Sequence, residues 1–134
     1  ILQALGDAGA AHAAYAQARD ELQARIPTGP DDALLHAALA QALSGLGEHA
    51  EATRIAEAAA TMPTQSVLDQ QQARLALAEV HMRAGRADDA VDGLRGLMRE
   101  SAGGVLSAHA LRLDPTWDPL RATPTFAALL QELE

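Results

Sequence analysis

Apolar residues recur along most of this chain at the three- and four-residue spacing of amphipathic helices. Twice, such an apolar stripe leads to a glycine, and a second stripe begins almost at once. Because glycine can adopt the left-handed conformation that ends a helix, this order predicts two pairs of antiparallel helices. We expect helices over about residues 7–25, 32–45, 48–62, 66–84 and 88–101, with shorter helical segments after residue 110.

The two predicted pairs carry the same residue pattern in the same order. The matching positions are Leu39-Ala40, Leu43, Gly47, Ala52, Ala56 and Ala59, and then Leu77-Ala78, His81, Gly85, Ala90, Leu94 and Leu97. The two glycines lie 38 residues apart, a period within the range of helical repeat arrays. One such unit cannot bury its own apolar face, so we expect the pairs to stack and to present a surface for binding.

Small residues occupy the positions where paired helices would approach most closely. These positions are Ala40 with Ala52, and Ala78 with Ala90. A methyl group permits close contact there, whereas a larger side chain would force the two helices apart.

The predicted helix starts carry acidic or hydroxyl side chains, which accept hydrogen bonds from free N–H groups or offset the positive end of the helix. We expect this role for Asp31 or Asp32, Glu48, Ser66 with Asp69, and Asp88 with Asp89. Residues 27–30 and Pro63 break the chain between pairs, and residues 102–104 form a joint before the last segment.

The repeated pattern resembles the tetratricopeptide repeat (TPR), in which Leu and a small residue precede a large residue, a Gly and a second helix with small residues. His81 and Arg74 stand where the family usually has large apolar residues, and the period exceeds the usual length of about 34 residues. A partial match to the turn and second helix of a preceding repeat supports the resemblance. The residues of this partial match are Gly6-Asp7, Ala11, Tyr15 and Ala18. The chain is therefore similar to a fragment of a longer array.

This resemblance implies an all-α fold in which antiparallel helix hairpins form a right-handed superhelix, a TPR-like solenoid. The partial repeat would span residues 1–26 and the full repeats residues 31–63 and 66–101. A short helical cap would follow over residues 102–134.

The pattern changes over residues 111–130. Asp114-Pro115, Asp118-Pro119 and Thr123-Pro124 each pair a capping side chain with a Pro suited to the first helical position, which predicts three short helices. The stretch resembles the ending that follows TPR arrays in bacterial serine/threonine kinases and in winged-helix or adenylate-cyclase-type regulators. Thr123, Thr125 and Ala127 replace the family's usual Asp, Arg and Gln. We expect a lid on the last repeat, built from Trp117, Leu120, Phe126, Leu129 and Leu130.

Composition agrees with an all-helical fold and narrows the function. About a quarter of the residues are Ala and only 2% are aromatic, so strand formers are scarce. The absence of Cys excludes disulfide and thiol chemistry, and no apolar run approaches the roughly 20 residues of a membrane span. We expect a soluble, cytoplasmic protein. The net charge of −8 disfavours nucleic acids and anionic membranes as ligands and leaves protein partners.

No combination of residues predicts catalysis, a cofactor or a bound metal. The five His residues form no His-x-x-x-His pair, and no Glu-x-x-His pair lies on one helical face. Gly103-Gly104 lacks the flanking residues of a nucleotide-binding loop, and the acidic pairs fall at helix starts. We therefore expect a chain with no enzymatic activity of its own, although the full-length protein could carry a kinase or other catalytic domain.

The resemblance also implies a binding face, because the first helices of successive TPR repeats line a concave groove. The corresponding positions are Leu34, Ala37, Gln41 and Ser44 in the first full repeat and Gln72, Leu75, Glu79, Met82 and Arg83 in the second. They lack the Lys, Arg and Asn set with which some family members clamp a peptide carboxylate. Leu75 and Met82 leave two interpretations open, an exposed peptide groove or a surface covered by the chain's own terminal segment.

Two hypotheses about function follow. The first is a protein-interaction scaffold, the C-terminal TPR module of a larger bacterial signalling or regulatory protein, which binds a protein, a peptide or an adjacent domain of the same chain. The second is a structural self-association domain that forms homo-oligomers.

Overall fold

The structure, a computed structural model, describes residues 2–25, 33–62, 66–100 and 107–132, and within these ranges it contains helices and no strand. The predicted all-α class is therefore confirmed. The expected cap at residues 31–32, the chain breaks at 27–30 and 63, and the joint at 102–104 lie outside the described residues. The helices are α1 (Leu2–Arg25), α2 (Ala33–Gly45), α3 (His49–Thr61), α4 (Val67–Arg83), α5 (Ala87–Glu100), α6 (Ala108–Leu113), the 3₁₀-helix η2 (Pro115–Leu120) and α7 (Pro124–Glu132).

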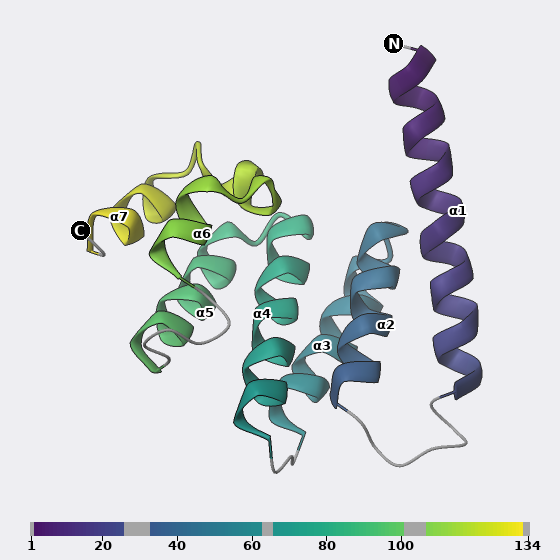
Figure 1. The fold of residues 1–134 in the computed structure, drawn as a ribbon, viewed down its shortest axis with the longest axis horizontal. Helices are drawn as coiled ribbons and strands as arrows, with labels where there is room; N and C mark the ends of the chain where they lie inside the picture. The colour runs from purple at the N-terminus through teal and green to yellow at the C-terminus, as the bar shows by residue number, and fades with distance from the viewer. Residues whose placement is uncertain (1, 26–32, 63–65, 101–106, 133–134) are drawn as a thin grey trace.

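Helices α2 to α5 form two antiparallel pairs that lie side by side (Figure 1). Helix α2 packs against α3, and α4 packs against α5. Helix α4 also packs against both helices of the first pair, which joins the two pairs into one body.

The turns within the two pairs have the same geometry. Gly47 has φ 85° and Gly85 has φ 81°, and both values lie in the left-handed region that favours glycine. In each turn the residue after the glycine donates its N–H to a carbonyl five positions back, as in a Schellman motif. These bonds are Glu48 N to Leu43 O at 3.0 Å and Arg86 N to His81 O at 2.8 Å. The prediction that both glycines end helices in the left-handed conformation is confirmed.

The alanines predicted at the closest helix contacts are all buried. Ala40, Ala52 and Ala90 have no exposed surface, and Ala78 is 1% exposed. Within the first pair they pack with larger residues from three helices, namely Leu39, Leu43, Ile55 and Val80. The methyl groups thus allow the helices of each pair to pack closely, with Ala40 and Ala52 in one apolar cluster and Ala78 and Ala90 in another.

One predicted helix start has the expected capping hydrogen bond, and a second has its acidic residues in the expected first turn. Ser66 precedes α4, and its hydroxyl accepts the N–H of Asp69 at 3.1 Å. Asp88 and Asp89 lie in the first turn of α5. Glu48 is the residue before α3, but its side chain makes no capping hydrogen bond.

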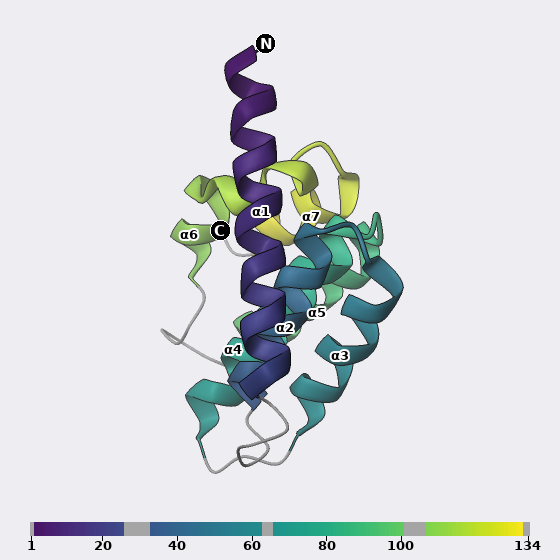
Figure 2. The same cartoon turned by 90° about the vertical axis from the view of Figure 1, so that its right-hand side faces the viewer.

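The N-terminal helix α1 differs from the sequence prediction in where it begins. The predicted turn at Gly6-Asp7 is wrong, because α1 runs without interruption from Leu2. A glycine inside a helix costs only about 1 kcal/mol, which the surrounding Ala and Leu residues can offset. The helix lies antiparallel to α2, with Leu22 packed against the core of the first pair, and its N-terminal part projects beyond the rest of the chain (Figure 2).

The C-terminal elements α6, η2 and α7 pack onto the second pair, at the far side of the molecule from α1 (Figure 1). Their buried residues join one core with residues of α4 and α5, among them Met82, Leu94 and Leu97. The expected apolar lid is confirmed in its packing for Trp117, Leu120, Phe126, Leu129 and the half-buried Leu130.

The helix starts within this cap differ in part from the prediction. Asp114 caps η2 and Thr123 precedes α7, as expected. Pro119, however, lies inside η2 and begins no separate helix. Helix α6 was not predicted, although Ser107 gives a local signal for it: the Ser107 hydroxyl accepts the N–H of Ala110 at 3.0 Å.

Candidate functional site

The structure brings four of the predicted groove residues together with the C-terminal cap. Between α2 and α4 on one side and α6 and η2 on the other lies a cleft of about 170 Å³, which we call the cap cleft. Four of its lining residues belong to the predicted groove, namely Gln41, Gln72, Leu75 and Glu79. The remaining lining comes from Ala76, Ala110, Asp114, Thr116 and Trp117.

Three of the predicted groove residues are buried within the chain itself. Ala37 is buried among other alanines of the first and second pairs, and Met82 is buried against the cap. Ser44 is 3% exposed, and its hydroxyl has no hydrogen-bond partner among the described residues. Their places in the predicted face are therefore corrected, because helix packing and the cap cover them.

Two further groove residues lie outside the cap cleft. Leu34, near the start of α2, is 38% exposed. Arg83, near the end of α4, is exposed, and its guanidinium lies 5.7 Å from the centroid of the Tyr15 ring in α1. The cap covers Met82 while Leu75 lines the cleft that remains, so the exposed peptide groove stays a prediction.

Hydrogen bonds across helices hold the acidic wall of the cap cleft. The amide of Gln41 in α2 donates from Nε2 to Oε2 of Glu79 in α4 at 3.0 Å. Arg83 donates from Nη2 to the other carboxylate oxygen of Glu79 at 2.9 Å. Glu79 is therefore fixed between two helices, with one neutral and one cationic partner.

The opposite wall carries a second carboxylate, that of Asp114. Its Oδ1 accepts the backbone N–H of Thr116 at 2.9 Å. This hydrogen bond is the main reason why the pKa of Asp114 lies below its ordinary value, and the positive charge of Arg121 acts in the same direction. Asp114 is consequently ionised at neutral pH.

Arg121 holds the cap wall in its bent shape. Its guanidinium donates to the backbone carbonyls of Leu111 and Asp114, at 2.9 and 2.7 Å, and to the carboxylate of Asp118 at 2.7 Å. The same group lies 5.9 Å from the centroid of the Phe126 ring. Sequence reasoning missed this role, because the carbonyls that Arg121 binds are brought together only by the folded cap.

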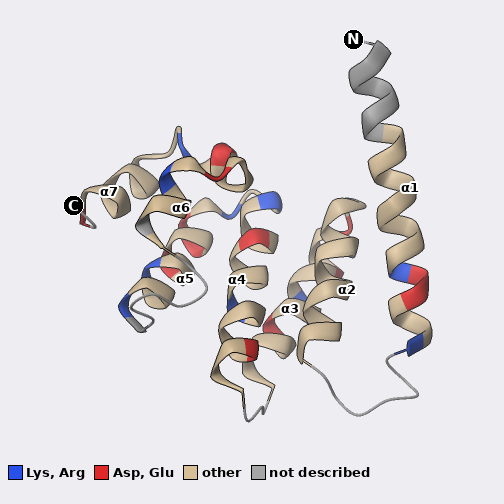
Figure 3. Cartoon of the chain, viewed as in Figure 1, with Lys and Arg blue, Asp and Glu red and all other residues tan. Residues whose placement is uncertain are grey.

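Charged residues of both signs are interspersed over the surface. Along α4, Asp69, Arg74, Glu79 and Arg83 alternate in sign, and Figure 3 shows acidic and basic positions mixed in the cap as well. The described residues thus present no broad basic face of the kind that binds a phosphate backbone.

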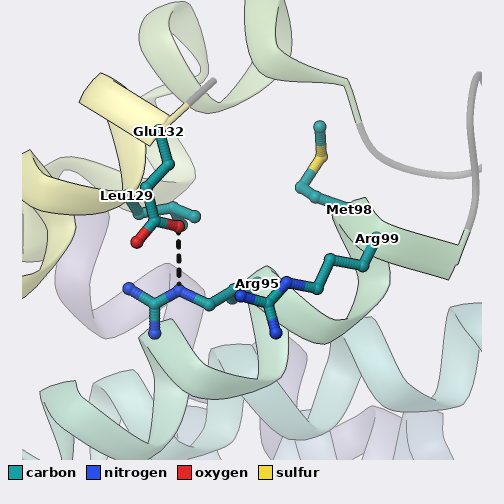
Figure 4. Close-up of a pocket in the computed structure, with 5 residues that line it drawn as sticks. All are labelled: Arg95, Met98, Arg99, Leu129 and Glu132. Carbon is teal, nitrogen blue, oxygen red and sulfur yellow. Dashed lines mark hydrogen bonds and ion pairs between the residues drawn. The ribbon is translucent and has the colours of Figure 1, made fainter. Parts of the chain in front are cut away.

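A larger hollow of about 310 Å³ lies between α5 and α7, where Arg95, Met98, Arg99, Leu129 and Glu132 line it (Figure 4). Across this hollow Arg95 donates from Nε to Oε2 of Glu132 at 3.0 Å. None of these residues belongs to the predicted groove. The ion pair ties the last helix to α5, so we assign the hollow a structural role in holding the cap.

The described residues contain no group of three or more His, Cys, Asp or Glu side chains placed to hold a metal ion. Among the helices described, none is long and apolar enough to span a bilayer. Comparison of the chain with protein-family models, with curated proteins and with solved structures found no match.

Proposed function

We propose that this chain is a protein-interaction module that binds a segment of a partner protein, or of an adjacent domain, in the cap cleft. The observation that carries the proposal is the convergence of residues from α2, α4, α6 and η2 on one cleft. Gln41, Gln72 and Thr116 offer hydrogen-bonding groups beside the apolar surfaces of Leu75 and Trp117. A cleft that combines apolar surface with hydrogen-bonding and acidic groups suits a peptide segment, which carries both kinds of group.

The module is proposed to be a TPR-like solenoid that serves a larger bacterial signalling or regulatory protein in the cytoplasm. The support for a repeat array is the pair of turns at Gly47 and Gly85 with matching hydrogen bonds, and the packing of α4 on both α2 and α3. The bacterial signalling context rests on the resemblance of residues 111–130. We further propose that the chain binds without catalysing a reaction and without a cofactor.

Site-specific photo-crosslinking in the natural full-length protein tests this function. A photoreactive amino acid at Gln72, an exposed position of the cleft, should crosslink to a partner or an adjacent domain. The same group at Glu57, an exposed position of α3 outside the cleft, should not. Leu75→Arg should abolish the crosslink by filling the cleft, whereas Leu113→Arg, at a side chain that is 65% exposed, should leave it unchanged. Equal crosslinking from positions 72 and 57 would contradict the proposal.

Self-association is the second candidate, and the exposure of α1 favours it. Of its described side chains, those of residues 9–25, none is buried, and residues 9–14 are all exposed. A second copy could cover this helix. Multi-angle light scattering over a range of concentrations distinguishes the two functions, because a scaffold remains monomeric while a self-association domain forms a dimer that Ala11→Asp and Ala14→Asp weaken.

A further inference from the structure

The cap cleft places two carboxylates on opposite walls and no cationic side chain among its lining residues. Glu79 comes from α4, and Asp114 comes from the residue that caps η2. The half-buried Leu75 and the buried Trp117 line the same cleft. The cleft therefore joins an apolar surface to an acidic rim.

The two carboxylates differ in how far they are already satisfied. Both oxygens of Glu79 accept hydrogen bonds, from Gln41 and Arg83. Within the described part of the chain, the carboxylate of Asp114 accepts hydrogen bonds from Thr116 alone, among them the backbone N–H at Oδ1, and the residue is exposed so that a further donor can reach it. Because Asp114 is ionised and exposed, it can accept a further hydrogen bond from a charged donor, and this bond must outweigh the loss of bound water from both groups.

We propose that the cap cleft recognises a cationic side chain, arginine or lysine, in the segment that it binds. This inference rests on the proposed function and names the chemistry of the partner. The head group of the partner's side chain would bond to the exposed carboxylate of Asp114 and lie near Glu79, whose charge Arg83 partly offsets. Its methylene stem would pack on Leu75 and Trp117, as long basic side chains do on apolar surfaces.

Size and overall charge agree with this occupant. A space of about 170 Å³ corresponds to roughly five or six water molecules, which suits one long side chain and not a whole helix. The chain's net charge of −8 would also raise the rate at which a cationic segment encounters it.

Nuclear magnetic resonance of the intact chain tests the inference with two matched peptides. The first is a short acetylated and amidated peptide of alanine and leucine with one central arginine. The second has citrulline in place of the arginine, which keeps the shape and removes the charge. The indole signal of Trp117, the only Trp in the chain, and the amide of Leu75 report binding at the cleft. The arginine peptide should bind roughly tenfold more tightly than the citrulline peptide.

Charge-removing variants locate the effect. Asp114→Asn keeps a side chain that can cap η2 and should reduce the preference for arginine over citrulline to near one. Glu79→Gln should reduce it in part. Glu57→Gln removes one charge from α3, outside the cleft, and should leave the preference unchanged.

Three results would overturn the inference. Equal affinities for the two peptides would show that the cleft binds by shape without charge, which leaves the proposed function intact. If Asp114→Asn and Glu57→Gln reduced the preference for the arginine peptide equally, the peptide would be attracted to the whole acidic surface and not to the cleft. If neither peptide shifts the signals of Leu75 and Trp117, cationic recognition fails, and crosslinking at position 72 then decides separately whether the cleft binds a partner.

Discussion

The aromatic ring of Tyr15 in α1 occupies the space into which a side chain at Gly45 of α2 would project. A Cβ built on Gly45 would lie 2.5 Å from Cδ2 of Tyr15, closer than real carbon atoms approach. Arg83 of α4 lies over the same ring. This contact positions α1 on the two pairs, and it depends on the missing side chain at residue 45.

Gly45→Ala should therefore destabilise the chain by about 1 to 3 kcal/mol, because Tyr15 must move out of its site. In the background of Tyr15→Ala the same substitution should stabilise by up to about 1 kcal/mol, as alanine normally does inside a helix. Urea denaturation of the two single variants and the double variant measures this coupling. Stabilisation by Gly45→Ala in both backgrounds would contradict the contact.

The turn glycines should tolerate no β-branched residue. Gly47→Val and Gly85→Val should each lower the free energy of unfolding by about 1 to 2 kcal/mol, because valine does not readily adopt positive φ. No atom lies within 4 Å of a Cβ at either position, so the cost comes from the backbone and not from a clash. Gly9→Ala within α1 is the control and should be neutral or stabilising. An unchanged thermal midpoint for both valine variants would refute the role of these turns.

The buried alanines should resist enlargement. Ala52→Leu and Ala90→Leu should each cost about 1 to 3 kcal/mol, since neither site has exposed surface. Ala18→Leu, at a half-buried position of α1, should cost less because its side chain can extend toward solvent. Thermal unfolding monitored by circular dichroism compares the three variants, and equal losses would argue against tight contact within the pairs.

The cap should contribute strongly to stability. Phe126 has no exposed surface and Trp117 is 3% exposed, so Phe126→Ala should cost about 3 to 5 kcal/mol. Removal of residues 110–134 should lower both solubility and the thermal midpoint, because it uncovers Met82, Leu94 and Leu97. The fluorescence of Trp117 should be blue-shifted in the intact chain. Water-like emission together with an unaffected truncated chain would show that the cap does not pack as described.

His81 should make stability depend on pH. Burial lowers the pKa of His81 below its ordinary value of 6.5, although the carboxylates of Asp89 and Glu57 act in the opposite direction. The unfolded chain then binds a proton that the folded chain excludes. The stability contributed by this group is therefore complete above pH 6.5 and is lost as the pH falls from there through the lowered pKa of the folded state.

Urea denaturation from about pH 7.5 down to about pH 5 tests this effect. His81→Leu should flatten the dependence over this range, because it removes the titrating group from the interior. His12→Leu, at an exposed position of α1, is the control and should retain the dependence. An identical dependence in the natural chain and in His81→Leu would assign it to other groups.

Local physics explains why much of the helical organisation could be predicted. A glycine before a new apolar stripe, or a Ser three residues before an Asp, acts within one turn of backbone, and so Gly47, Gly85 and Ser66 behave as their neighbours in sequence indicate. Local signals also mislead where several conformations are close in energy. Gly6 continues α1, because one glycine costs only about 1 kcal/mol in a helix, and Pro119 lies inside the short 3₁₀-helix η2 and does not begin a new one.

For the candidate site, too, some residues could be predicted from the sequence and others only from the folded structure. The resemblance to the tetratricopeptide repeat, carried over position by position, assigned Gln41, Gln72, Leu75 and Glu79 to one face, and in the structure these four residues line one cleft. Only the tertiary structure decided that Ala37 and Met82 are covered and that Asp114 and Trp117 complete the cleft. These outcomes depend on how the cap folds back onto α4 through buried apolar contacts between residues distant in sequence, and such contacts leave no periodic trace along the chain.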